Sequence, residues 1–352
     1  MKNKLIVTTG YMGSGSSAVT DLLAEYENVN CSNGCFEYVF LHCPNGLFDL
    51  EDKLLIGNNA LRSDEALHSF KKTMHALYIN NGNWTSNYRK FLSPDFEKMY
   101  LDFVRELSPY CLEDVYWYYQ QNPENIRMKL QLLLGKILRK LSRGKIALPT
   151  PLSYKDMMVA YPSKEEFYEA SRNFLDAVFG KMGIEEQNIV LDQLLLPHNL
   201  NRIDDYFDDN LRVIVVDRDP RDVYLLNKYV WTRTGQIIPY SMDAAVFCDM
   251  YRKIRENAKC SDKRILKIHF EDLVYNYQST VRKITKFIGL DEEAHVHQQQ
   301  NFDPRKSINN TQLFVRNIFS DDGIPMIEER LGAYCYPFDS SLPDFDDSKL
   351  IF

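Results

Sequence analysis

The feature that most constrains the fold is a Gly/Ser-rich stretch near the N-terminus, Gly10-Tyr11-Met12-Gly13-Ser14-Gly15-Ser16-Ser17. It follows a short apolar run at residues 5–9 and precedes a helical pattern from residue 18 to about residue 26. Glycines let a backbone approach an anion closely, and free N–H groups where the next helix begins point at that anion. The order of strand, turn and helix therefore predicts a phosphate cradle, whose candidate binding residues are Tyr11, Met12, Gly13, Ser14, Gly15, Ser16 and Ser17.

The chemistry of this cradle is limited by the residue that follows its last glycine. Gly10 and Gly15 fit the spacing G-x-x-x-x-G, but Ser16 stands where an NTP-hydrolysing P-loop needs a lysine. The loop is therefore predicted to hold an anion without ATP hydrolysis or kinase chemistry. The alternative is a turn that merely caps a helix, and the density of Gly and Ser at residues 13–17 argues against it.

Apolar runs that suit strands recur along the chain, at residues 5–9, 36–41, 188–194, 211–216 and 264–270. Near-continuous apolar runs are typical of strands buried on both faces of a parallel sheet. We therefore expect an α/β fold with a doubly wound, mostly parallel sheet, whose ligands bind at the C-terminal ends of the strands. Helical spacing dominates in between, at residues 95–107, 125–141 and 163–179. This pattern predicts one domain over residues 1–352, with a helical insertion at about 50–185 and a peripheral C-terminal tail at about 319–352.

Composition narrows the classes of partner. A net charge of −7 argues against a general nucleic-acid binder, and no segment has the ~18 uncharged residues that span a bilayer. Seven scattered cysteines fit a soluble, cytoplasmic chain, and Cys31, Cys35, His42 and Cys43 lack the spacing of a zinc site, so no metal is expected. The basic, amphipathic residues 127–145 suit at most peripheral contact with an anionic membrane or acceptor. Their more usual interpretation is a core-facing helix with a solvated basic side. The oligomeric state is open.

A second anion site is predicted where the run at 211–216 ends, in Asp217-Arg218-Asp219-Pro220-Arg221-Asp222. Arg218 stands at the ligand edge of the sheet, and its planar fork suits a phosphate. Two alternatives stay open: a cap in which Arg218 and Arg221 neutralise the neighbouring carboxylates, or a magnesium-binding Asp217, as in NTPases.

Together these motifs resemble the sulfotransferases that use 3′-phosphoadenosine 5′-phosphosulfate, and bacterial members in particular. Residues 10–17 are similar to their 5′-phosphosulfate loop, and residues 218–223 to their 3′-phosphate motif, whose leading arginine binds that phosphate. Residues 270–290 and 302–307 resemble the segments that follow in the family. The resemblance covers the first ~40 residues and about 185–315. It implies a P-loop-like fold, the phosphosulfate nucleotide as donor, no metal, and a small-molecule or glycan acceptor.

Two positions depart from the family's pattern. Gly13 aligns with the usual loop lysine, and Leu226 with the usual serine of the 3′-phosphate site. Asn227 or Lys228 is then the candidate substitute for that serine. The cation that the family's loop lysine would supply is expected from Arg305, Lys306 or Arg62. The departures keep two other functions open, a P-loop kinase or NTPase and a non-catalytic nucleotide-binding protein.

Sulfuryl transfer also needs a base that takes the proton of the acceptor hydroxyl. Glu37 is the first candidate, because a glutamate near the second strand has this role in some glycan sulfotransferases of the family. A carboxyl in the apolar segment 36–41 also has its pKa raised by desolvation. The alternative is an outward-facing or ion-paired Glu37, and His42 is the second candidate base. Asp192 and Gln193 end a predicted strand where they could touch acceptor or donor. The expected reaction is sulfuryl transfer to a hydroxyl of a glycan, glycolipid or small alcohol.

Overall fold

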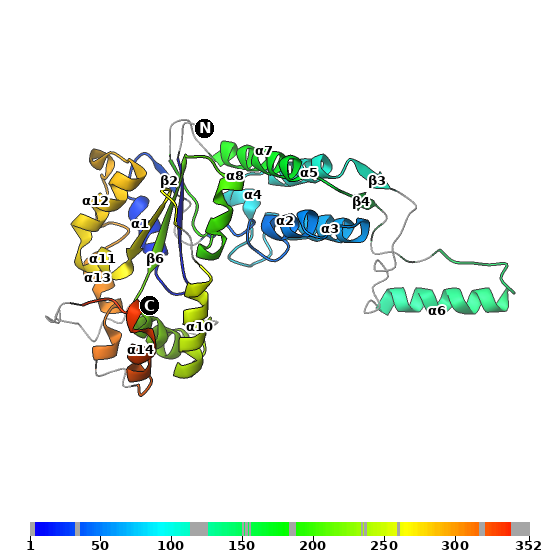
Figure 1. The fold of residues 1–352 in the computed structure, drawn as a ribbon. Coiled ribbons are helices and arrows are strands. Elements are labelled where there is room, and N and C mark those ends of the chain that lie inside the picture. The colour runs from blue at the N-terminus through cyan, green and yellow to red at the C-terminus, as the bar shows by residue number, and fades with distance from the viewer. Residues whose placement is uncertain are drawn as a thin grey trace. The chain divides into compact units, whose positions relative to one another are not determined.

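The computed structural model describes residues 4–31, 36–112, 126–149, 151, 154, 156–182, 188–233, 235, 238–258, 261–316 and 321–338. Its strands are β1 (Leu5–Gly10), β2 (Val29–Cys31), β3 (Tyr110–Leu112), β4 (Met157–Val159), β5 (Asn188–Val190), β6 (Leu211–Asp217) and β7 (Ile265–His269) (Figure 1). Its α-helices are α1 (Ser17–Leu23), α2 (Leu47–Leu55), α3 (Ala60–Tyr78), α4 (Tyr88–Phe91), α5 (Phe96–Leu107), α6 (Ile126–Leu141), α7 (Lys164–Met182), α8 (Ile203–Tyr206), α9 (Pro220–Leu225), α10 (Ala244–Glu256), α11 (Phe270–Tyr275), α12 (Tyr277–Ile288), α13 (Pro304–Ser307) and α14 (Ile324–Leu331).

The chain divides into two compact units. One comprises residues 1–43, 77–96 and 175–352, and the other comprises residues 44–76 and 97–174. The second unit contains the antiparallel pair β3–β4 and is otherwise mainly helical. The helices predicted from apolar spacing at 95–107, 125–141 and 163–179 are confirmed as α5, α6 and α7.

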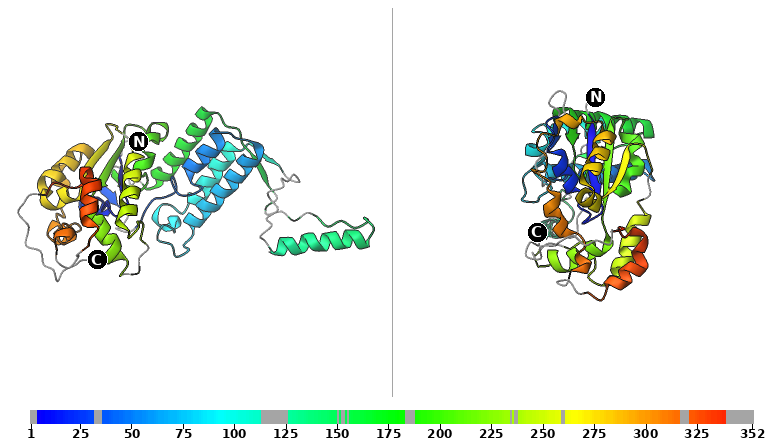
Figure 2. Two further views of the ribbon diagram at one scale, coloured as in Figure 1. Left: turned by 60° about the horizontal axis from the view of Figure 1, so that its bottom comes forward. Right: turned by 90° about the vertical axis from the view of Figure 1, so that its left-hand side faces the viewer.

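The first unit contains a five-stranded parallel sheet in the order β2-β5-β1-β6-β7, which confirms the predicted α/β fold class. The central pair β1–β6 is in register from Leu5 opposite Leu211 to Gly10 opposite Val216. α1 and α12 cover one face of this sheet, and α10 covers the other (Figures 1 and 2). The chain leaves β1 toward one edge and β6 toward the opposite edge, so a topological switch point lies between these two strands.

The strands predicted from the sequence are confirmed in part. Those at 5–9, 211–216 and 264–270 are confirmed as β1, β6 and β7, whereas β5 ends at Val190. The strand predicted at 36–41 is wrong, and β2 lies earlier, at Val29–Cys31. Phe36, Tyr38 and Phe40 are buried alternately, as in a strand, but they pack into a cluster of aromatic rings. The backbone N–H of Tyr38 donates to the carbonyl of Asp192, at 2.9 Å, instead of forming a ladder.

Two apolar cores lie in the first unit. One lies under α1 and α12, and the other joins α9, α10 and α14. Ile327 and Leu331 of α14 are completely buried, so this part of the expected peripheral tail is a core element. The sequence did not predict this burial, because a helix of eight residues is too short to show a clear helical spacing of its apolar residues. The acidic residues 339–352 lie outside the described residues.

A buried carboxylate fixes the segment that leads to α13. Glu25 is fully buried and accepts hydrogen bonds from His295 Nε2 at 2.7 Å and from the backbone N–H groups of Gln299, Asn301 and Phe302 at 2.9–3.1 Å. An amide at this position would aim its NH₂ group at some of these donors and leave them unsatisfied.

We expect Glu25→Gln to lower the free energy of unfolding by about 2 kcal/mol, the usual loss for buried hydrogen bonds to a charged group. Urea denaturation monitored by circular dichroism measures this effect. Glu27→Gln is the matched control, because Glu27 is exposed and its loss should cost under ~0.5 kcal/mol. Equal stability of the two variants would contradict the anchoring role.

Candidate functional site

The loop between β1 and α1 has the backbone of an anion cradle. Gly13 and Gly15 adopt φ of +79° and +82°, which L side chains rarely reach, and Ser14 N donates to Tyr11 O at 2.8 Å to close the turn. A Cβ at Gly15 would lie 2.9 Å from the ring of Phe270, and one at Gly13 would lie 2.6 Å from Cη2 of Trp231. Both glycines are therefore required by their neighbours as well as by their φ angles.

Several polar groups of this loop have no partner in the described part of the chain. The N–H groups of Gly15, Ser16 and Ser17 donate no hydrogen bond to it, and the buried Ser14 Oγ also lacks a partner there. Such a set of donors around one turn has the arrangement that can bind an anion. Tyr11 is half-buried at the start of the loop.

Gln193, three residues beyond the end of β5, holds the loop from one side. Its Nε2 donates to Ser16 Oγ at 2.8 Å, and its Oε1 accepts from Thr9 Oγ1 at 3.1 Å. Its backbone has φ +58°, an uncommon value for a residue other than glycine, and this bend lets its N–H reach Thr8 O at 2.9 Å. The sequence singled out this residue only by its position at a strand end.

His42 is attached to the same residue. Its Nε2 lies 2.8 Å from the carbonyl oxygen of Gln193, so Nε2 carries the proton and donates. Burial lowers the pKa of His42, which keeps the ring neutral and leaves Nδ1 as the nitrogen that can accept a proton. The structure thus brings this candidate base to the strand that flanks the loop.

Glu37 lies beside a second carboxyl, that of Asp192. Burial, and secondarily the charge of Asp192, raises the pKa of Glu37 to about 7. Burial also raises the pKa of Asp192 to about 7, although the hydroxyls of Thr8 and Thr20 oppose the shift. Thr8 Oγ1 donates to Asp192 Oδ1 at 3.2 Å, which connects this carboxyl pair to β1, the strand that enters the loop. A carboxyl with a pKa near 7 can exchange protons at neutral pH.

Arg218 flanks the loop on its other side, at the end of β6. Its side chain is buried, donates from Nη1 to Gly13 O at 3.4 Å and from Nη2 to Asn310 O, and stacks over the ring of Phe270 at 4.6 Å. Its Nε has no partner among the described residues. Burial lowers the pKa of this guanidinium, whereas the carboxyls of Asp222 and Glu271 oppose that shift. Arg218 therefore lies directly against the predicted phosphate loop.

The other charged residues of the Arg218 motif stabilise the surrounding structure. Asp219 caps α9 and pairs with Arg221 at 2.6 Å, while Arg221 also pairs with Glu328 at 2.8 Å. Asp222 accepts hydrogen bonds from two backbone N–H groups of the segment after α13, those of Gln312 and Leu313. The predicted capping role fits Arg221 but describes Arg218 incompletely, because Arg218 bonds backbone oxygens rather than carboxylates.

Three of the predicted binding residues are bonded to other parts of the structure or exposed to solvent. Both polar atoms of the Asn227 amide are bonded to the backbone of Tyr240, at 3.0 and 3.1 Å. Arg305 is 79% exposed and pairs with Asp303. Lys306 is exposed beside it on α13, and its ammonium makes no hydrogen bond or ion pair with the described residues. Among the described residues, no hydrogen bond or ion pair joins these three side chains to the loop. Met12 and Ser17 of the loop itself are exposed.

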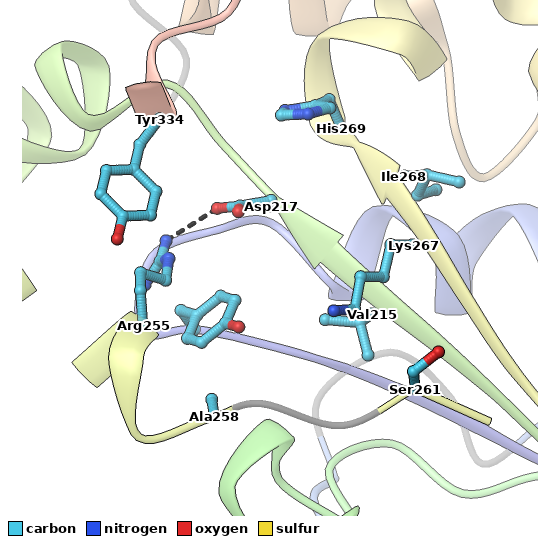
Figure 3. Close-up of a pocket in the computed structure, with 10 residues that line it drawn as sticks. Val215, Asp217, Arg255, Ala258, Ser261, Lys267, Ile268, His269 and Tyr334 are labelled. Atoms are coloured by element: carbon cyan, nitrogen blue, oxygen red, sulfur yellow. Dashed lines mark hydrogen bonds and ion pairs between the residues drawn. The ribbon is translucent and has the colours of Figure 1, made fainter. Parts of the chain in front are cut away.

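A hollow of about 600 Å³ opens beside Tyr11 on the α10 face of the sheet, lined by residues of β6, β7 and α10 and by Tyr334 (Figure 3). Arg255 of α10 stacks on the ring of Tyr11 at 3.4 Å and pairs with Asp217 at 2.7 Å. Sequence reasoning missed Arg255, because an arginine in an ordinary amphipathic helix carries no local signal. Asp217, the possible magnesium ligand of the sequence analysis, is thus ion-paired with an arginine. No cluster of three metal-ligating side chains occurs among the described residues.

Comparisons with solved structures return sulfotransferases of low similarity. The sulfotransferase domain from the curacin biosynthetic pathway is 13% identical over 86% of this chain and 80% of that one, with a TM-score of 0.35. The sulfotransferase domain of the Synechococcus PCC 7002 olefin synthase is 16% identical over 96% and 98%, with a TM-score of 0.37. Sulfotransferase STF9 from Mycobacterium avium is 11% identical over 97% and 78%, also at 0.37.

A search of curated proteins finds no match. The model of the sulfotransferase family matches residues 6–294. This match includes the cradle loop, Glu37, His42 and Arg218, and it ends before Arg305 and Lys306. Because it spans most of the sequence, the chain belongs to the sulfotransferase family.

Proposed function

We propose that the protein transfers a sulfuryl group from 3′-phosphoadenosine 5′-phosphosulfate to a hydroxyl of a glycan, glycolipid or small alcohol. The observation that carries this proposal is the juxtaposition of two anion-binding groups at the switch point between β1 and β6. Loop donors without a partner among the described residues follow one strand, and Arg218, whose Nε also has no partner there, lies against them after the next strand. A donor with phosphate at both ends of its ribose matches such a pair.

The loop and Arg218 have different roles in this proposal. The N–H groups of Gly15, Ser16 and Ser17, together with the Ser14 hydroxyl, hold the 5′-phosphosulfate, and Gln193 keeps Ser16 in place. Arg218 Nε supplies a charged donor for the 3′-phosphate. Positioned donors of this kind also stabilise the charge that develops as the donor nucleotide leaves.

Glu37 is the proposed general base. In the transfer step the acceptor oxygen forms a bond to sulfur, the bond from sulfur to the bridging oxygen of the nucleotide breaks, and the acceptor proton passes to the Glu37 carboxylate. Its pKa of about 7 fits this role, because a base with a pKa near the working pH combines adequate strength with adequate ionisation. Lys306 is the proposed cation near the leaving nucleotide, since its ammonium is exposed and makes no ion pair with the described residues.

Ligand-induced stabilisation tests the donor. We expect 3′-phosphoadenosine 5′-phosphate to raise the melting temperature without added metal, by a stabilisation of about 2.7 kcal/mol at ~100 times its Kd. ATP with magnesium should have little effect, because the loop lacks the NTPase lysine. Differential scanning fluorimetry with each nucleotide, with and without magnesium, measures both. Stabilisation by ATP alone, and only with magnesium, would instead support the kinase or NTPase alternative.

One observation favours a second candidate, a nucleotide-binding protein without turnover. The indole of Trp231 lies over Gly13, at the position where the family places its loop lysine. This alternative predicts nucleotide affinity but no sulfated product with any acceptor. Incubation with donor labelled in the sulfuryl group, across a panel of glycans, glycolipids and alcohols, separates the two.

A further inference from the structure

α6 exposes a continuous apolar face. Six of its apolar side chains are 45–77% exposed, and they follow one another at intervals of one, three or four residues, which places them on one side of the helix. They are Ile126, Leu130, Leu133, Leu134, Ile137 and Leu141. The interpretation of this stretch as a core-facing helix is therefore wrong for this face, which is exposed rather than buried.

The helix already has a different packed stripe. Met128 is buried, and Leu132, Gly135 and Leu138 are half-buried. This stripe faces the chain's own residues 147–149 and 151, and a Cβ at Gly135 would lie 3.8 Å from Cβ of Leu148. The exposed apolar face is thus separate from this packed stripe.

The charge around this face has a single sign. Residues 126–149 contain seven Lys and Arg and no Asp or Glu, in a chain with a net charge of −7. Lys129, Lys136 and Lys140 recur at intervals of seven and four residues, so they form one row along an edge of the apolar face. All three are exposed. A long apolar stem with a cationic end at the border of an apolar face is the arrangement in which lysines reach lipid headgroups.

We propose that α6 binds the surface of a bilayer that contains anionic lipids, lying in the interfacial plane with its six exposed apolar side chains among the acyl chains. Within the part of the chain that the structure describes, no helix is long and apolar enough to cross a membrane, so this contact is peripheral. A second copy of α6 is a poorer occupant, because its lysine row would find no carboxylate on the partner helix. The inference does not depend on the sulfuryl-transfer proposal.

Vesicle flotation tests the inference with the full chain. We expect binding to vesicles of phosphatidylcholine mixed with phosphatidylglycerol, weak binding to phosphatidylcholine alone, and weakening by sodium chloride. Lys129→Gln/Lys136→Gln/Lys140→Gln should lower the partition coefficient on the order of 100-fold, since each surface lysine contributes roughly fivefold. Leu130→Gln/Leu133→Gln/Ile137→Gln should lower it at least as much, because it removes the inserted apolar surface.

Control variants remove similar groups from other parts of the chain. Arg282→Gln/Lys283→Gln/Lys286→Gln removes three exposed positive charges from α12, and Val246→Gln/Val296→Gln removes exposed apolar side chains outside α6. Both control variants should bind vesicles like the parent protein. Near-UV circular dichroism checks that every variant is folded. The inference is overturned if the folded parent protein does not bind anionic vesicles, or if the α6 variants bind them as strongly as the parent protein does. It is also overturned if light scattering shows that the apolar face only joins two copies of the chain.

Discussion

Glu37→Gln is expected to lower turnover by about 10² to 10⁴, the usual range for losing a general base, and to leave nucleotide affinity nearly unchanged. The two side chains have the same shape, and Glu37 is only half-buried, so the fold should tolerate the change. Turnover is measured with labelled donor and the acceptor found by screening, and affinity by calorimetry with 3′-phosphoadenosine 5′-phosphate.

The pH dependence follows from the raised pKa of Glu37. Below about pH 7 the carboxyl is protonated and cannot accept a proton, so kcat/KM should rise with pH and level off above about 7. The rise should disappear from the residual activity of Glu37→Gln. His42→Ala is the comparison: parent-like turnover in Glu37→Gln beside an inactive His42→Ala would assign the base to His42.

Arg218→Gln is expected to weaken nucleotide binding by about 2 to 4 kcal/mol, or roughly 30- to 1,000-fold, because a charged donor fork is removed from a phosphate. The substitution should also lower the free energy of unfolding by about 1 to 3 kcal/mol, since Arg218 joins Gly13 to Asn310 in a buried position. Calorimetry at a temperature where the variant is folded measures affinity, and urea denaturation measures stability.

Arg221→Gln is the control from the same motif. It removes ion pairs to Asp219 and Glu328, and it should lower stability without a comparable loss of affinity. A folded Arg218→Gln variant that binds the nucleotide like the parent protein would reduce Arg218 to a structural residue.

The parts of the fold that could be predicted are those that local sequence determines. β1 and β6 are continuous apolar runs followed by Gly/Ser or charged residues, and parallel pairing brings their C-terminal ends to one edge. That was enough to predict the loop and Arg218 at neighbouring strand ends. β2 was missed because only one of its three residues, Val29, is strongly apolar, whereas the aromatic residues 36–40 carried a stronger alternating pattern without pairing to any strand.

The details of the candidate site depend on contacts between distant residues. Gln193 contacts Ser16 across 177 positions, and its positive φ has no marker in the sequence. The raised pKa of Glu37 could be expected from its apolar neighbours, but the contribution of Asp192 could not, because it requires β5 to end beside the segment that follows β2. The exposure of α6 was equally hidden, since an amphipathic pattern does not reveal whether anything covers its apolar face.

The contact between Gly13 and Trp231 limits how sequences of this kind can change. A lysine at position 13 would meet the indole at its Cβ, before the rest of its side chain is placed, and would also occupy a φ of +79°. The two large side chains therefore exclude each other unless the indole moves. The effect of substituting either position is therefore expected to depend on the residue at the other.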